Sequence, residues 1–162
     1  MANRRELPPR LPPSGSPNVL FQQFRTGMAL RELMQEAVAG TGVTGEEYGV
    51  LGVIAFFPGR TPTELATTLG IPPTTVSRHV ARFFADGLVE RSANPSDGRS
   101  YLLSPTARGR EIVETIAPRI GELVAALKAV SEVPLEEIAA ALAALETAAK
   151  RVVQERGFAT NR

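Results

Sequence analysis

The sequence contains no cysteine and a single histidine among its 162 residues. Without cysteine there is no disulfide, no thiol redox centre and no thiolate metal ligand, and one histidine removes most of the remaining metal sites. No apolar run approaches the length of a membrane-spanning helix, and the N-terminus lacks the apolar segment of a signal peptide. These absences predict a soluble, cytoplasmic protein that has no metal, no cofactor and no membrane partner.

Catalytic groupings are missing as well. The serines lack a histidine and acid set within a recognisable motif, and there is no glycine-rich phosphate loop. A DNA-repair or DNA-modifying enzyme is disfavoured, because no cysteine nucleophile, metal set or paired acid–base site is found. The sequence therefore predicts a protein that is not an enzyme.

The most informative stretch, residues 61–106, begins with signals for two short helices. The first helix starts with a threonine cap, a proline and a capping-box glutamate and stops at a glycine: Thr61, Pro62, Glu64 and Gly70. The second is expected after Ile71-Pro72-Pro73 and runs to about Ala85. Two short helices joined by a glycine turn predict a helix-turn-helix.

A hairpin is expected next. Leu88 to Arg91 and Arg99 to Leu103 have strand character, and Asn94-Pro95-Ser96-Asp97-Gly98 between them is turn sequence. Ser104-Pro105 then predicts the start of a long helix, as an N-cap followed by proline at the first helical position. Helix, turn, helix and hairpin together predict a winged helix.

Amphipathic helices flank this unit on both sides. Their expected bounds lie near Asn18 and Ala39, Thr44 and Phe57, Ser104 and Val130, and from Pro134 onward. Pro118 is expected to kink the long helix, because proline removes a backbone donor. The predicted class is mainly α with a small β-hairpin wing, in the order α-α-α-α-β-β-α-α. Apolar seams on the last two helices favour packing against each other or against a second copy.

The predicted organisation has five parts. They are an extended or disordered N-terminal arm (1–17), an N-terminal helix of a dimerisation region (18–43), a winged helix-turn-helix DNA-binding domain (44–104), C-terminal dimerisation helices (105–156) and a tail (157–162). The arm is proline-rich. Its arginines Arg4, Arg5 and Arg10 suit a basic DNA-binding arm, but a solvated tail or a segment packed on a dimer partner is the favoured interpretation.

The distribution of charge supports DNA as the partner, although the net charge is only +1. Residues 71–110 hold six arginines against three acidic residues, whereas residues 111–162 hold six basic and eight acidic residues. The positive charge is therefore concentrated on the expected winged helix, as binding to a phosphate backbone requires.

The wing carries a specific sequence signature. It reads GLVER and then NPSDGRSYLLSPTARG, with an Asp97-x-Arg99 pair and Gly109 beyond it. Together with the preceding helix pair, this signature resembles the MarR family of bacterial transcription regulators over roughly Val19 to Val153. Pro72 departs from the family, which usually has a capping Ser, Thr or Asp there. The resemblance implies a homodimer, most often a repressor, on a palindromic DNA operator, with small aromatic or lipophilic molecules as frequent effectors.

Candidate DNA contacts lie on the second helix of the helix-turn-helix and on the wing. Hydroxyl groups near a helix N-terminus suit phosphate or base-edge contacts, and Arg78 can bind a guanine edge. Arg99 suits a narrow minor groove, whereas Asp97 is expected to cap the turn or pair with an arginine. The resemblance implies that the helix lies in the major groove and that Asp97 and Arg99 are the wing pair. The full candidate set is Thr74, Thr75, Ser77, Arg78, Arg82, Asp97, Arg99 and Ser100.

Some alternatives stay open. His79 is a pH-sensitive DNA contact, a ligand-pocket residue or, as the favoured interpretation, a partly buried packing group. A set of aromatic and methionine residues has two interpretations: it lines an effector pocket or, as the favoured interpretation, it is part of the hydrophobic core. The set is Phe21, Phe24, Met28, Tyr48, Phe56 and Phe57. The alternative function is a winged-helix protein-interaction module without sequence-specific DNA binding.

Overall fold

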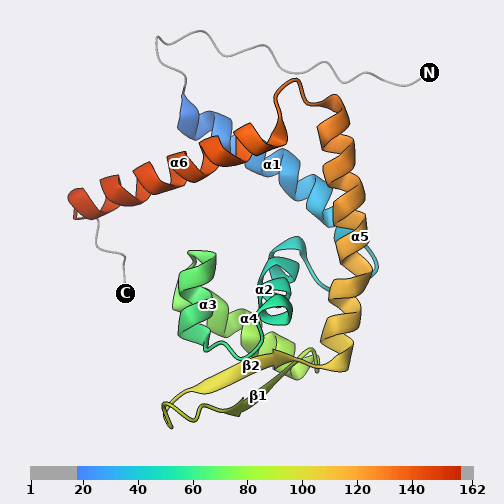
Figure 1. The fold of residues 1–162 in the computed structure, drawn as a ribbon, viewed down its shortest axis with the longest axis vertical. Coiled ribbons are helices and arrows are strands. Elements are labelled where there is room, and N and C mark those ends of the chain that lie inside the picture. Colours follow the sequence, from blue (N-terminus) through green and yellow to red (C-terminus); the bar gives the residue numbers. More distant parts are fainter. Residues whose placement is uncertain (1–17, 158–162) are drawn as a thin grey trace.

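The computed structural model describes residues 18–157, so the predicted arm and most of the predicted tail lie outside the described residues. Within that range the chain forms six α-helices and one two-stranded antiparallel sheet (Figure 1). The elements are α1 (Val19–Val38), α2 (Gly45–Phe56), α3 (Pro62–Leu69), α4 (Pro73–Ala85), β1 (Val89–Ala93), β2 (Tyr101–Pro105), α5 (Ala107–Val130) and α6 (Leu135–Glu155). The predicted class and element order are confirmed.

The first three helices begin at side-chain N-caps, close to their predicted bounds. Asn18 caps α1 through its side chain, and Thr44 and Thr61 form complete capping boxes with Glu47 and Glu64 at the starts of α2 and α3. In each box the threonine hydroxyl accepts a backbone N–H while the glutamate accepts the threonine N–H, so two otherwise unpaired donors are satisfied. These local interactions explain why the starts of these helices were predictable.

In the turn between α3 and α4, the predicted glycine conformation is present, but α4 has no side-chain N-cap. Gly70 adopts the left-handed conformation with φ 65°, as predicted. The next helix begins at Pro73 itself, with Pro72 at the N-cap position and no side-chain cap. Proline fits the first helical position because its missing N–H is not needed there. Helix α4 therefore begins with proline at its first position and without a side-chain cap.

The hairpin lies slightly further along the chain than predicted. Arg99 and Ser100 belong to the turn and not to the second strand, because both donate their backbone N–H to Asp97, to its side chain and its carbonyl respectively. The described residues also contain a short extra bridge that the sequence did not predict, between Arg60 and Leu103. The bridge joins the segment before α3 to the wing.

The predicted start of the long helix at Ser104-Pro105 is wrong. Both residues belong to β2, where proline is tolerated because β2 is an edge strand of a two-stranded sheet. Thr106 is the N-cap: its hydroxyl accepts the Gly109 N–H at 3.1 Å and donates to the Gly87 carbonyl at 2.7 Å. Helix α5 is thus capped and tied to the wing by the same side chain.

The core lies in the winged lobe, under α4 and between α2, α3, the hairpin and the first half of α5. The largest fully buried side chains are Phe83, Leu51, Ile54, Leu65, Leu103, Ile116, Val76, Val80 and Pro105. Helix α4 buries Val76, Val80 and Phe83, while Phe84 is partly buried. In Figure 1, α5 rises from this lobe along one side and α6 returns across the top of the view.

The aromatic and methionine set does not form core in the single chain. Phe21, Phe24, Met28, Phe56 and Phe57 are between 40% and 66% exposed, and Tyr48 alone packs partly against the core. The favoured interpretation as core is therefore wrong for all but Tyr48. On α1 these side chains leave an apolar face open to solvent.

Candidate nucleic-acid interface

Helix α4 presents a polar side to solvent opposite its buried side. Thr74, Ser77, Arg78 and Arg82 are exposed, and Thr75 is half-buried. The Ser77 hydroxyl donates to the Pro73 carbonyl at 2.9 Å, so its oxygen remains an acceptor for a DNA group. The hydroxyl residues of α4 that are predicted as DNA contacts therefore lie in the first half of this helix.

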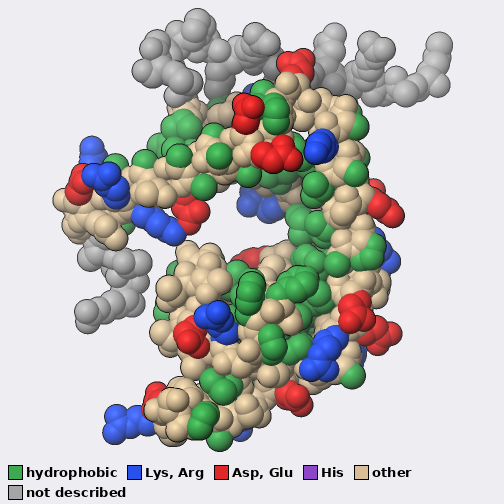
Figure 2. All heavy atoms as spheres, viewed as in Figure 1, with side chains coloured by type: hydrophobic (Ala, Val, Ile, Leu, Met, Phe, Trp, Pro, Cys, Tyr) green, Lys and Arg blue, Asp and Glu red, His purple; other side chains and the backbone are tan. Residues whose placement is uncertain are grey.

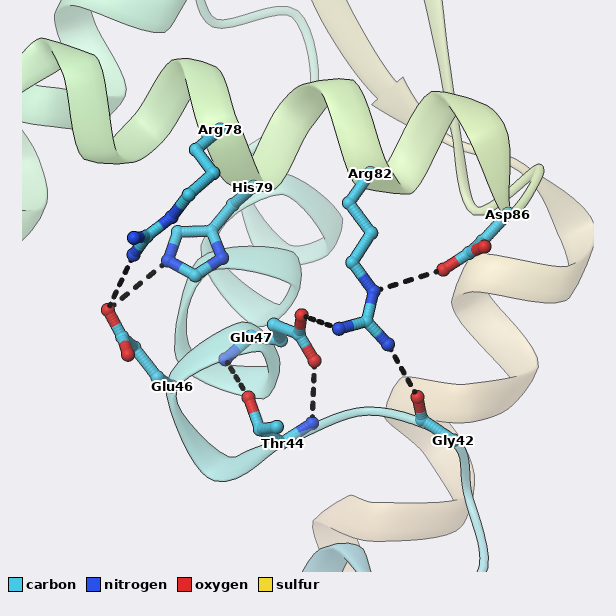
Figure 3. A network of polar contacts seen from close by, with 8 residues as sticks. All are labelled: Gly42, Thr44, Glu46, Glu47, Arg78, His79, Arg82 and Asp86. Carbon is cyan, nitrogen blue, oxygen red and sulfur yellow. Dashed lines mark hydrogen bonds and ion pairs between the residues drawn. The ribbon is translucent and has the colours of Figure 1, made fainter.

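Two acidic residues in the first turn of α2 face the recognition helix (Figure 3). The Glu46 Oε1 lies 3.2 Å from His79 Nε2 and 3.9 Å from Arg78 Nη2. The Arg78 and Glu46 side chains are 71% and 65% exposed, and such solvated pairs contribute only about 0–1 kcal/mol. Arg78 can therefore leave this partner for a DNA group at little cost.

Arg82 is held very differently. Its Nη1 lies 2.6 Å from Glu47 Oε1, its Nε lies 3.3 Å from Asp86 Oδ2, and its Nη2 donates to the Gly42 carbonyl at 3.3 Å. The Glu47 side chain is only 6% exposed, and its second oxygen accepts the Thr44 N–H at 2.7 Å. Arg82 thus joins α4 to the start of α2 and to the preceding loop.

His79 is a packing residue, as the favoured interpretation predicted. It is 6% exposed and stacks on Phe83 with ring centroids 6.2 Å apart. Its Nε2 lies against Glu46, so the ring has a polar partner although it is buried. The histidine therefore helps to seat α4 on α2.

The wing turn is held by its own side chains. The Asp97 carboxylate accepts the Arg99 N–H at 3.0 Å, so Asp97 caps the turn, one of its two predicted tasks. The Ser100 hydroxyl accepts from Asn94 Nδ2 at 2.7 Å and donates to the Asp97 carbonyl at 3.3 Å, so it is engaged within the turn. Arg99 is exposed. Figure 2 shows basic side-chain atoms at the free end of the hairpin.

Sequence reasoning missed the contacts between α2 and α4. Glu46 and His79 are separated by 33 positions in the chain. No local pattern reports such a pair. The only available signal is the run of three basic side chains on one side of a helix that lacks a side-chain cap: Arg78, His79 and Arg82.

One pocket of about 290 Å³ lies between the α1–α2 loop and the first half of α5. It is lined by Gly40, Thr41, Arg108, Glu111, Ile112, Thr115 and Arg119, and none of these belongs to the predicted aromatic pocket set. Among residues 18–157, no three histidine or acidic side chains are grouped to hold a metal ion. No helix in that range is long and apolar enough to span a bilayer.

A helix with an exposed polar side after a tight turn, followed by a hairpin with an exposed arginine near its tip, is the arrangement of the winged-helix class of DNA-binding proteins. Residues 41–100 match the model of the MarR family. The chain is 31% identical over 91 residues to the HTH-type transcriptional repressor Rv2887 of Mycobacterium tuberculosis, a match that covers 56% of this chain and 66% of that protein, just under two thirds.

Solved structures agree with the sequence match. The M. tuberculosis regulator MosR in complex with DNA superposes with a TM-score of 0.73 at 25% identity, covering 83% of this chain and 97% of that one. A mutant MarR from Escherichia coli complexed with operator DNA gives 0.65 at 25% identity, covering 83% and 93%. These matches together support a winged-helix transcription regulator of the MarR family. Such regulators are not enzymes, in agreement with the sequence prediction.

Proposed function

We propose that this protein is a homodimeric repressor that binds a palindromic double-stranded DNA operator. The observation that carries the proposal is the exposed polar side of α4, with Thr74, Ser77 and Arg78, together with Arg99 on the wing. A helix of this kind fits the major groove, and an arginine on a hairpin fits the minor groove. Two relatives support DNA as the partner, since MosR and MarR were solved with DNA, and Rv2887 is named a repressor.

The exposed apolar surfaces of α1, α5 and α6 support the dimer. Helix α6 has no buried residue in the single chain, although it carries a regular apolar seam. Large apolar side chains on these three helices are 38% to 80% exposed: Leu20, Phe24, Met28, Val130, Ile138, Leu142 and Val152. Apolar surface of this extent favours burial against a partner. A two-fold dimer presents two recognition helices to successive major grooves, so its operator is a palindrome.

A small aromatic or lipophilic effector is the proposed releasing signal. An effector releases DNA only if it binds the DNA-free and DNA-bound arm arrangements unequally. The exposed aromatic side chains of α1, Phe21 and Phe24, supply a surface of the matching chemistry. Aromatic carboxylates and phenols are therefore the first compounds to screen for lowered operator affinity.

The deciding experiment is selection of bound fragments from genomic DNA followed by footprinting. Symmetric protection of two half-sites, about one helical turn apart or a multiple of it, supports the proposal. Binding without sequence preference at physiological salt, together with stable capture of a protein partner, favours the protein-interaction module instead.

A further inference from the structure

The proposed recognition helix, α4, must be oriented by contacts other than a cap at its own N-terminus. Helix α4 has Pro72 at its N-cap and no side-chain cap bond. A cap fixes the entry of most helices through a side-chain acceptor, and that interaction is missing here. The polar contacts that do fix α4 come from the first turn of α2, where Glu46 and Glu47 face it (Figure 3).

Arg82 is the centre of this support. Three of its side-chain nitrogens each have an oxygen partner, on Glu47, Asp86 and Gly42. Guanidinium is planar, so three partners in three directions fix both its position and its plane. The same Glu47 carboxylate also closes the capping box of α2. The contact therefore locks the recognition helix to the start of its neighbour.

Arg78 and Arg82 differ in what it costs to release them. Arg78 has one exposed partner at 3.9 Å, Glu46. Releasing Arg82 would leave the carboxylate of Glu47 buried and without its cation, which is strongly unfavourable. Of the two arginines, Arg78 is the one that DNA can recruit.

We propose that Arg82 is a positioning residue, which sets the pose of the recognition helix through buried Glu47, and that it does not read DNA itself. The proposal rests on the DNA-binding function proposed above and, of the two arginines of α4, assigns the base-reading role to Arg78 alone.

The support extends to the arm helix α5. The carbonyl that Arg82 holds, that of Gly42, belongs to the loop of residues 39–44. The beginning of this loop is held by Arg119 of α5, whose Nη1 donates to the Ala37 and Ala39 carbonyls at 3.2 and 2.9 Å. Arg82 of α4 and Arg119 of α5 thus both donate hydrogen bonds to this loop. Arg82 therefore links the orientation of α4 to helix α5 as well as to α2.

The test compares Arg82→Gln, Glu47→Gln and the double variant on the selected operator, by fluorescence anisotropy at several salt concentrations. Each single change is expected to lower affinity about tenfold, and the double variant to lose little more, because both changes break one link. The slope of log affinity against log salt should stay that of the parent, since no phosphate contact is removed. Arg78→Ala is the matched control: its loss should add in full to that of Glu47→Gln and flatten the slope.

Arg82→Lys keeps the charge, but a single compact ammonium nitrogen cannot replace the three separate guanidinium nitrogens that contact Glu47, Asp86 and Gly42. A positioning role predicts that this variant loses affinity as Arg82→Gln does. Near-parent affinity for Arg82→Lys, or a flattened slope with full additivity for Arg82→Gln and Glu47→Gln, overturns the proposal and makes Arg82 a phosphate contact.

Hydrogen exchange of the α4 backbone amides tests the positioning role of Arg82 in the absence of DNA. Protection should fall in both single variants and stay unchanged in Arg78→Ala, and undiminished protection in Arg82→Gln overturns the role. Failure of the parent to prefer any DNA sequence would count against the proposed repressor function, while the exchange result still decides the role of Arg82.

Discussion

Gly109, in the first turn of α5, packs directly against the backbone of Leu88 at the entrance to the wing. A Cβ atom at position 109 would lie 2.1 Å from the Leu88 carbonyl oxygen, far inside any real contact. The same oxygen accepts the Thr106 N–H at 3.0 Å. The close approach is therefore part of the junction that sets the long arm helix on the DNA-binding lobe. It also explains why glycine at this place belongs to the wing signature.

Gly109→Ala should destabilise the protein, because the added methyl group meets backbone and not a side chain that can move. Overpacking of this kind costs about 1–3 kcal/mol in the free energy of unfolding. Gly121→Ala is the control, since it lies in the same helix with nothing within 4 Å and should stabilise by up to about 1 kcal/mol. Denaturant unfolding of both variants measures the difference, and equal effects would contradict the close approach.

The capping box at α3 should give a pH-dependent contribution to stability. The Thr61 backbone hydrogen bond, followed by the Thr61 hydroxyl, lowers the pKa of Glu64 from its usual value. A carboxylate with a lowered folded-state pKa stabilises the fold above its unfolded pKa, and this contribution is lost as pH falls through the folded value. Glu64→Gln should therefore be less stable than the parent at neutral pH and converge with it in acid. Unfolding curves across the acid range test this, and a constant gap between the two proteins would contradict it.

Much of the fold was readable from the sequence because its signals are local. The capping boxes at Thr44 and Thr61 and the left-handed Gly70 each involve residues a few positions apart. The start of α5 was misplaced because Ser104-Pro105 satisfies the rule for a helix start, while its membership of β2 depends on pairing with β1 across the hairpin. Strand pairing is a non-local interaction that a helix-start pattern does not report.

In the candidate site, too, local features could be predicted from the sequence and contacts between distant residues could not. The exposure of Arg78 and Arg99 follows from helical spacing and from the turn sequence, and the structure agrees with both. The engagement of Arg82 with Glu47, however, depends on how α4 crosses α2. Spacing alone makes Arg78 and Arg82 equivalent, one helical turn apart. Only the packing of the two helices separates an arginine with a buried acidic partner from one with an exposed partner.

Leu142→Glu should convert the proposed dimer into monomers with much weaker operator binding. Leu142 is 47% exposed on the apolar seam of α6, and a charge there would be buried in a dimer interface without a partner. Ala144→Glu is the control, because two residues turn the helix by about 200° and place the charge on the opposite side. Sedimentation by ultracentrifugation measures both. A parent that sediments as a stable monomer would remove the dimer from the proposal.

Arg78→Ala should weaken specific binding and relax the sequence preference. A good contact from arginine to a guanine edge supplies about 1–3 kcal/mol of discrimination, and the preference should be lost at one or two base pairs in each half-site. Folding should survive, since the side chain is 71% exposed and its ion pair with Glu46 is also exposed. Titration against operators substituted at single positions measures the effect. A uniform loss on all sequences would show that Arg78 contacts phosphate and not bases.

Arg99→Ala should instead reduce affinity evenly among sequences of similar groove shape. Arg99 stands on a turn that Asp97 and Ser100 hold by their own hydrogen bonds, so removing its side chain leaves the turn intact. An arginine presented in this way reads the width and negative potential of the minor groove, which are strongest in A/T-rich flanks. The loss should therefore be largest on operators with such flanks, and the salt slope should fall by about one unit per protomer as one counterion is no longer displaced. The measurement needs operators that differ only at the flanks, titrated at several salt concentrations. Parent-like binding on every one of them would mean that the wing does not contact DNA.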